Sequence, residues 1–154
     1  MGDRVDVSLT VRKADQKKVE EIIEEHAGSY DDLTEGACPP NMVKIIEYNF
    51  YDVNYADLKI ESILQENAIP YDKEWGQGGD YNPGSEIFRI NEKGEFIIKK
   101  FEGNLMGMVA LSDVINAFEM NRVGEYIDRM KQEASVISWE EQEKTRFSPC
   151  NNID

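Results

Sequence analysis

The sequence predicts an α+β fold, a mostly antiparallel sheet of about four strands with helices on one face. The first observation is the alternation of apolar and polar residues from Val5 to Val11, the pattern of a half-buried strand. The second is the helical spacing of apolar residues in the segment that follows. The third is Asn91-Glu92-Lys93-Gly94, a turn sequence between two apolar segments, which predicts a β-hairpin.

The predicted elements follow the order strand, helix, strand, helix, strand, strand, helix. The four predicted strands are residues 5–11, 42–51, 85–90 and 95–101. Tyr71 to Trp75 is a candidate for a further short strand. The segment 29–41, which is rich in acidic residues and proline, is expected to be an exposed loop.

Three segments have helical periodicity. The first is expected to begin at Asp15 and to end at Gly28, a residue type common after a helix C-terminus. The second is expected to begin after Asn54, a good N-cap residue, and to end before Pro70. The third starts near residue 105 and includes Ile115 and Phe118 in its apolar stripe.

A chain of 154 residues is long enough for one domain with its own apolar core. No internal repeat or interdomain linker divides it, so we expect residues 1–134 to form a single α+β domain. From residue 135 the apolar pattern fades. We therefore expect residues 135–154 to form a loosely ordered C-terminal tail.

Charge is the unusual property of this chain. Asp and Glu number 31 and Lys and Arg 17, which gives a formal net charge of −14. A surface this negative repels nucleic-acid phosphates and anionic membranes, so we expect neither direct nucleic-acid binding nor membrane attachment. It favours a basic partner, such as a protein that itself holds nucleic acid. The alternative is that the acidity only maintains solubility.

The cysteines and the N-terminus indicate a cytoplasmic protein. Cys38 and Cys150 are far apart and form no C-x-x-C motif. The N-terminus lacks the apolar stretch of a secretion signal, and no segment approaches the ~20 apolar residues that span a bilayer. We therefore expect free thiols in the cytoplasm.

Most familiar active-site chemistry lacks its residues here. His26 is the single histidine, and its place on the apolar stripe of the first helix favours a partly buried structural role. One histidine and two scattered cysteines are too few for a zinc site. The glycine cluster Gly76–Gly79 is followed by neither the helix of a dinucleotide-binding loop nor the lysine of a P-loop. We expect no catalytic residue, no metal ion and no cofactor.

Aromatic and acidic residues concentrate around the glycine cluster, a composition typical of recognition surfaces. Tyr and Trp supply contact area at low entropic cost, and carboxylates engage Arg or Lys on a partner. The alternative is that the aromatic residues belong to the core and that the glycines form a structural turn. The predicted partner-binding residues are Tyr51, Asp52, Tyr71, Asp72, Glu74, Trp75, Gln77, Asp80 and Tyr81.

Three short segments, residues 51–58, 69–72 and 75–81, resemble small uncharacterised accessory proteins carried by bacteria, phages and plasmids. Small acidic proteins of mobile elements include anti-restriction and anti-CRISPR inhibitors, some of which imitate the charge of DNA. The resemblance is one of class and charge, and it implies an inhibitor.

The sequence thus favours a non-enzymatic, acidic inhibitor or adaptor that binds a basic, nucleic-acid-handling protein, of the anti-defence or immunity type. Two alternatives belong to other classes. One is a small enzyme with a carboxylate site built from Asp52, Asp72, Glu74 or Asp80. The other is a structural protein of a phage or mobile element.

Overall fold

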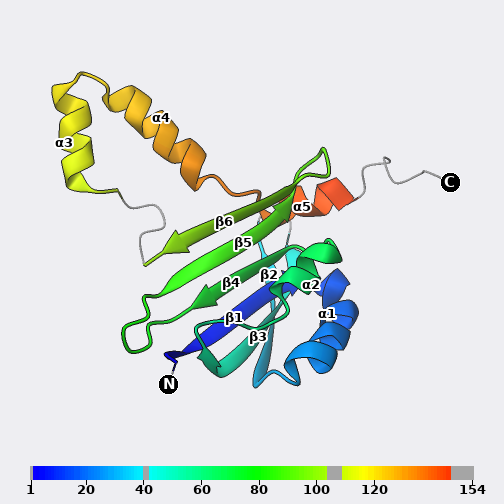
Figure 1. Cartoon of the computed structure of the whole chain (residues 1–154). Helices are drawn as coiled ribbons and strands as arrows, with labels where there is room; N and C mark the ends of the chain where they lie inside the picture. The colour runs from blue at the N-terminus through cyan, green and yellow to red at the C-terminus, as the bar shows by residue number, and fades with distance from the viewer. Residues whose placement is uncertain (1, 40–41, 104–108, 147–154) are drawn as a thin grey trace.

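A six-stranded antiparallel sheet forms the centre of the molecule, with strand order β2-β3-β1-β4-β5-β6 (Figure 1). The computed structural model describes residues 2–39, 42–103 and 109–146. The strands are β1 (Arg4–Arg12), β2 (Asp32–Cys38), β3 (Val43–Asn54), β4 (Tyr71–Trp75), β5 (Gly84–Ile90) and β6 (Phe96–Glu102). The predicted α+β class with one antiparallel sheet is confirmed, and the predicted number of about four strands is wrong.

The two additional strands are short or highly polar. β4 is the segment that the sequence suggested as a candidate short strand. β2 lies inside the predicted exposed loop 29–41 and pairs along its whole length with β3, from Asp32 opposite Asn49 to Cys38 opposite Val43. Its side chains are mostly exposed, as expected, because β2 is an edge strand whose stability comes from backbone hydrogen bonds.

Helices lie over both faces of the sheet, so the predicted placement of the helices on one face is wrong. The helical elements are η1 (Lys13–Asp15), α1 (Gln16–Ile22), η2 (Ile23–Ala27), α2 (Glu61–Glu66), α3 (Leu111–Glu119), α4 (Val123–Ala134) and α5 (Trp139–Arg146). α1 and α2 lie over one face (Figure 1), and we call it the core face because the buried apolar side chains gather there. Val7, Leu9 and Val11 of β1 project into this core together with Val19 of α1 and Leu64 of α2.

The second predicted helix begins later than expected. β3 continues to Asn54, which pairs with Arg4, so Asn54 ends a strand rather than capping a helix. The chain then turns through residues 55–60, where Tyr55, Ala56 and Lys59 have positive φ angles of 51°, 56° and 64°. This turn places Tyr55 and Asp57 beside the sheet before α2 starts.

α5 packs on the opposite face of the sheet, in the segment predicted to be a loose tail. Its Trp139 is only 7% exposed and stacks on the guanidinium of Arg89, 3.9 Å from ring to Cζ. Gln142 accepts a hydrogen bond from the Ile90 N–H at 2.8 Å and donates one to the Ile90 carbonyl at 3.0 Å. Residues 139–146 are therefore ordered, while 147–154 lie outside the described residues.

α3 and α4 project away from the sheet as a helical hairpin (Figure 1). Lys99 of β6 secures its base, because the Lys99 ammonium donates to the carbonyls of Gln132, Glu133 and Ser135 at the C-terminal end of α4. The apolar stripe predicted here is exposed, since Ile115 and Phe118 of α3 face solvent. Among the described helices, none has the length and apolar character to cross a membrane.

Candidate functional site

One end of the sheet collects acidic side chains. Antiparallel pairing brings the starts of β1, β2 and β5 beside the ends of β3, β4 and β6. We define the acidic end as seven carboxylates at or beside these strand ends and in the loop after β4, namely Asp3, Asp6, Asp31, Asp32, Asp52, Glu74 and Asp80. Glu102, at the end of β6, lines the neighbouring pocket and is described with it.

The acidic end carries little compensating positive charge. Within the described part of the chain, its one ion pair joins Arg4 to Asp52 at 3.9 Å, and both side chains are largely exposed. Asp31 accepts a hydrogen bond from the Tyr51 N–H at 2.7 Å, and Asp6 accepts one from the Asp52 N–H at 3.2 Å. These backbone contacts fix the positions of the carboxylates but do not neutralise them.

The glycine loop lies against the start of β1. A Cβ on Gly78 would lie 2.1 Å from the Arg4 carbonyl oxygen, and a Cβ on Gly79, whose φ is +53°, would lie 2.5 Å from the Asp3 carboxylate. Both positions therefore require glycine. Gly78 also exchanges backbone hydrogen bonds with Tyr81, at 3.1 and 2.7 Å. The loop is a structural turn that holds Tyr81 in place and exposes Asp80.

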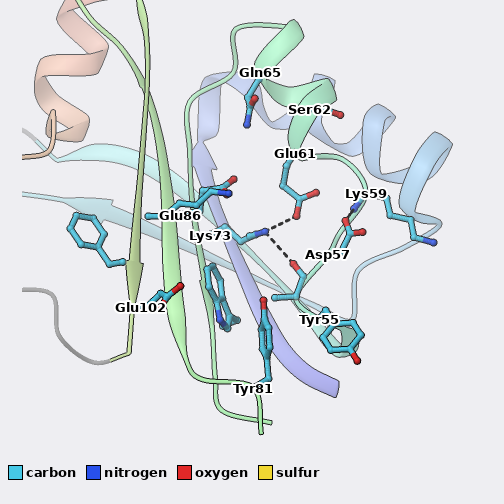
Figure 2. A pocket seen from close by; sticks show the side chains of 14 residues that line it. Tyr55, Asp57, Lys59, Glu61, Ser62, Gln65, Lys73, Tyr81, Glu86 and Glu102 are labelled. Atoms are coloured by element: carbon cyan, nitrogen blue, oxygen red, sulfur yellow. Dashed lines mark hydrogen bonds and ion pairs between the residues drawn. The ribbon is translucent and has the colours of Figure 1, made fainter. Parts of the chain in front are cut away.

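A pocket of about 630 Å³ opens on the core face beside this end, between the segment 55–65 and strands β4 to β6 (Figure 2). Three aromatic rings line one end of it. The Tyr81 ring lies 5.8 Å from the Tyr55 ring and 6.4 Å from the Trp75 ring, centroid to centroid. Trp75 lies over Gly84, whose lack of a side chain makes room for the ring, and donates from Nε1 to the Asn82 carbonyl at 3.0 Å.

The pocket floor contains a buried ion pair. Lys73 is 8% exposed, and its ammonium lies 2.7 Å from the Glu61 carboxylate and 3.1 Å from the Ala56 carbonyl (Figure 2). Burial alone would raise the pKa of Glu61, but the hydrogen bond and the charge of Lys73 outweigh it and lower that pKa below its usual range. The Glu61 carboxylate also accepts the N–H groups of Leu58 and Ile60, so it ties the turn before α2 to the sheet.

A second buried carboxylate, Glu86, lies next to this ion pair. Tyr71 donates from its hydroxyl to Glu86 at 2.5 Å and accepts from Gln65 at 2.9 Å, while the Lys100 ammonium lies 3.2 Å from Glu86. Burial and the hydrogen bond to Glu86 raise the pKa of Tyr71, so the phenol stays protonated. Lys73 and Lys100 are each matched by a carboxylate, and the remaining charges that line the pocket are Asp57, Glu102 and Lys59.

Most of the sequence-predicted residues meet at this end of the molecule. Tyr51, Asp52, Glu74, Gln77 and Asp80 are exposed at or beside the acidic end, and Trp75 and Tyr81 line the pocket. The predicted partner-binding residues do not include the other acidic-end carboxylates or three further pocket residues, which are Asp3, Asp6, Asp31, Asp32, Tyr55, Asp57 and Glu102.

Two predicted residues have structural positions instead. Tyr71 is fully buried beneath the pocket, so a partner cannot touch it. Asp72 points to the opposite face, where one carboxylate oxygen lies 2.7 Å from Arg89 and the other accepts from Trp139 Nε1 at 3.1 Å. Both belong to the packing of the sheet, because they lie at the start of β4, away from the exposed end, and point to its two opposite faces.

The four carboxylates considered for an enzyme do not meet in one cleft. Asp72 lies under α5, whereas Asp52, Glu74 and Asp80 are exposed at the acidic end. Across the described ranges, no group of three His, Cys, Asp or Glu side chains is arranged to hold a metal ion. Burial and the charge of Asp72 raise the pKa of the Cys38 thiol, which disfavours a reactive thiolate.

Comparison of the chain with protein-family models, with curated proteins and with solved structures gives no match. The geometry offers two adjoining surfaces of different chemistry. The acidic end is open and negative, and it attracts cations over a wide area. The pocket is concave, with aromatic rings on one side and a few carboxylates near them.

Alanine substitutions at Trp75 and Tyr81 should separate structural from recognition roles. Trp75→Ala removes a half-buried ring that covers Gly84, and we expect it to lower the free energy of unfolding by about 2 kcal/mol, less than the ~3–5 kcal/mol of a fully buried ring. Tyr81→Ala should cost about 1 kcal/mol and impair partner binding more clearly. Urea unfolding and a binding assay on each variant measure the two effects. A large stability loss for Tyr81→Ala with normal binding would assign Tyr81 to the core.

Proposed function

We propose that this chain is a non-enzymatic inhibitor or adaptor that binds a basic, nucleic-acid-handling protein in the cytoplasm through its acidic end. The observation that carries the proposal is the gathering of seven carboxylates at one end of the sheet, of which Asp52 alone has an ion-pair partner, Arg4, among the described residues. The class of protein is the anti-defence or immunity type, in which a negative surface takes the place of nucleic acid.

The physical basis is electrostatic complementarity. Opposite charges accelerate encounter between proteins and orient them, and this effect weakens as salt screens the charges over ~8 Å at physiological ionic strength. Tyr51, which is 55% exposed, and Gln77 add non-ionic contact area beside the carboxylates. A cationic cleft that normally holds phosphates would meet seven carboxylates distributed over this end.

The rival functions make different demands. If the acidity only maintains solubility, the position of the carboxylates does not matter and only their number does. A carboxylate enzyme needs two acids facing one substrate, whereas Asp52, Glu74 and Asp80 are spread over the exposed end. A structural protein of a phage or mobile element would bind further copies of itself or of a shell protein.

Two variants of equal net charge test the proposal. The end variant carries Asp31→Asn, Asp32→Asn, Asp52→Asn and Glu74→Gln. The flank variant removes the same number of charges from exposed helical positions, with Glu21→Gln, Glu24→Gln, Glu25→Gln and Glu66→Gln. We expect the wild type and the flank variant to capture the same basic protein from nuclease-treated bacterial lysate, and the end variant to bind it roughly tenfold or more weakly.

The captured protein then allows a quantitative measurement. Its association rate with the wild type should fall steeply from low to moderate salt, and double-stranded DNA should displace the acidic chain, because both compete for one cationic surface. If the end and flank variants bind the partner equally weakly, net charge alone determines binding and the position of the carboxylates does not matter. Rates that stay constant with salt would remove charge imitation altogether.

A further inference from the structure

The pocket beside the acidic end has the composition of a site for a planar cation. Its three aromatic rings, Tyr55, Trp75 and Tyr81, form a continuous row at one end. Aromatic faces attract cations through the negative potential of the ring, and guanidinium groups also stack on them. Figure 2 shows Tyr55 and Tyr81 side by side, and Glu102 on β6.

The charges around these rings favour a positive ligand. Lys73 lies within 5.3 Å of the Trp75 ring, but its charge is matched by Glu61 at 2.7 Å, and that of Lys100 by Glu86 at 3.2 Å. Of the remaining charged residues, Asp57 and Glu102 outnumber Lys59, and the acidic end adjoins the pocket.

Strand register gives Glu102 a defined position relative to the rings. Glu102 pairs with Gly84, and Gly84 pairs with Trp75, so all three belong to one row of the core face. Because Gly84 has no side chain, no group stands between the Trp75 ring and the Glu102 carboxylate in this row. A guanidinium on the aromatic row can therefore direct its N–H groups to a carboxylate, as arginine does in bidentate pairs.

We propose that this pocket binds an arginine side chain, with the guanidinium on the row of Tyr55, Trp75 and Tyr81 and hydrogen-bonded to Glu102 or Asp57. The inference rests on the proposed function, in which the arginine belongs to the basic partner. It also predicts that the pocket binds a small arginine analogue when that partner is absent.

The probe is N-acetyl-arginine amide, titrated into the ¹⁵N-labelled chain at physiological salt. The indole N–H of Trp75 reports on the pocket, and Trp139→Phe identifies which of the two indole signals it is. We expect saturable shifts for the Trp75 indole and for the Tyr55 and Tyr81 amides. N-acetyl-citrulline amide, which has the same shape without the charge, should produce none, and N-acetyl-lysine amide should bind several-fold more weakly because its ammonium is not planar.

Variants at the pocket and away from it complete the test. Tyr55→Leu and Glu102→Gln change exposed side chains and should each weaken binding of the arginine amide roughly tenfold. The matched controls Phe96→Leu and Glu92→Gln change an exposed ring and an exposed carboxylate outside the pocket, and should leave the affinity unchanged. Equal shifts with citrulline amide, binding of N-acetyl-glutamate amide instead, or unchanged affinity in the pocket variants would overturn the inference.

The two proposals fail separately. The end variant keeps every pocket residue, so it should bind the arginine amide nearly as well as the wild type does. If the arginine amide binds the pocket but no basic protein is captured, the pocket inference stands and the proposed function fails. If the basic partner binds through the acidic end while the arginine amide does not bind, the function stands and the pocket inference fails.

Discussion

Replacing Lys73 by Met is expected to lower the free energy of unfolding by about 3 kcal/mol. The substitution leaves the Glu61 carboxylate without its counter-charge in a largely buried position, since the Glu61 side chain is 16% exposed. Removing one partner of a buried pair costs ~3–5 kcal/mol, and the partial exposure of Glu61 places this case at the lower end. Urea unfolding followed by circular dichroism measures the change.

Lys100→Met is the matched control, because it removes a lysine from the neighbouring pair on the same face. Lys100 is 69% exposed, and the buried Glu86 carboxylate keeps its hydrogen bond from the Tyr71 hydroxyl, so the loss should be smaller than that of Lys73→Met. Equal losses for Lys73→Met and Lys100→Met would show that the Lys73 pair has no special structural role.

The Lys73–Glu61 pair also predicts how the free energy of unfolding depends on pH. The pKa of Glu61 is lowered in the folded chain, so its contribution is complete above the pKa of a free glutamate, ~4.3, and is lost as pH falls through the lower folded value. In Lys73→Met the burial of Glu61 is no longer opposed by Lys73, so the stability deficit should shrink as pH falls, starting above ~4.3, because a protonated Glu61 needs no counter-charge. Unfolding midpoints from pH 7 to pH 3 measure it, and a constant deficit would contradict the assignment.

The fold class was predictable because its strongest elements have a clear period. β1 alternates strictly, and the turn at residues 91–94 joins two apolar strands. β2 has no such signal, since an edge strand paired to β3 through its backbone requires no apolar residues. The sequence also placed the start of the second helix at Asn54, whereas pairing with Arg4 keeps that residue in β3.

The candidate site was predictable only where its residues are close in the sequence. The stretch from Glu74 to Tyr81 was identified as one cluster, and the structure keeps it together at the acidic end. Asp6 of β1, Asp31 just before β2 and Glu102 of β6 are far apart in the sequence, and only the antiparallel topology brings them to the same end. Composition showed that the chain is acidic, but not which carboxylates share a surface.

The order of residues 139–146 depends on a few specific contacts. The spacing of apolar residues in the sequence therefore did not predict it. α5 has no apolar stripe, and it packs through the Trp139 ring on Arg89 and through the two hydrogen bonds of Gln142 with Ile90. A single aromatic residue and an amide give no repeating pattern. Most of the free energy with which α5 packs on the sheet is therefore expected to come from one or two side chains.

Replacing Trp139 by Ala is therefore expected to cost about 3–4 kcal/mol, comparable with other buried aromatic residues. The ring covers Arg89 and donates a hydrogen bond to Asp72, so its loss exposes that ion pair to water and releases α5 from the sheet. Urea unfolding measures the stability. Amide hydrogen exchange at Ile90 reports the release of α5, because Gln142 accepts the hydrogen bond of that N–H.

Trp139→Phe separates the aromatic ring from its hydrogen bond. Phe keeps a ring that can lie over Arg89 but cannot donate to Asp72, so we expect a loss of about 1 kcal/mol and continued protection of the Ile90 amide. If Trp139→Ala unfolds like the wild type, with unchanged exchange at Ile90, α5 does not contribute to the fold and residues 135–146 behave as the loose tail that the sequence predicted.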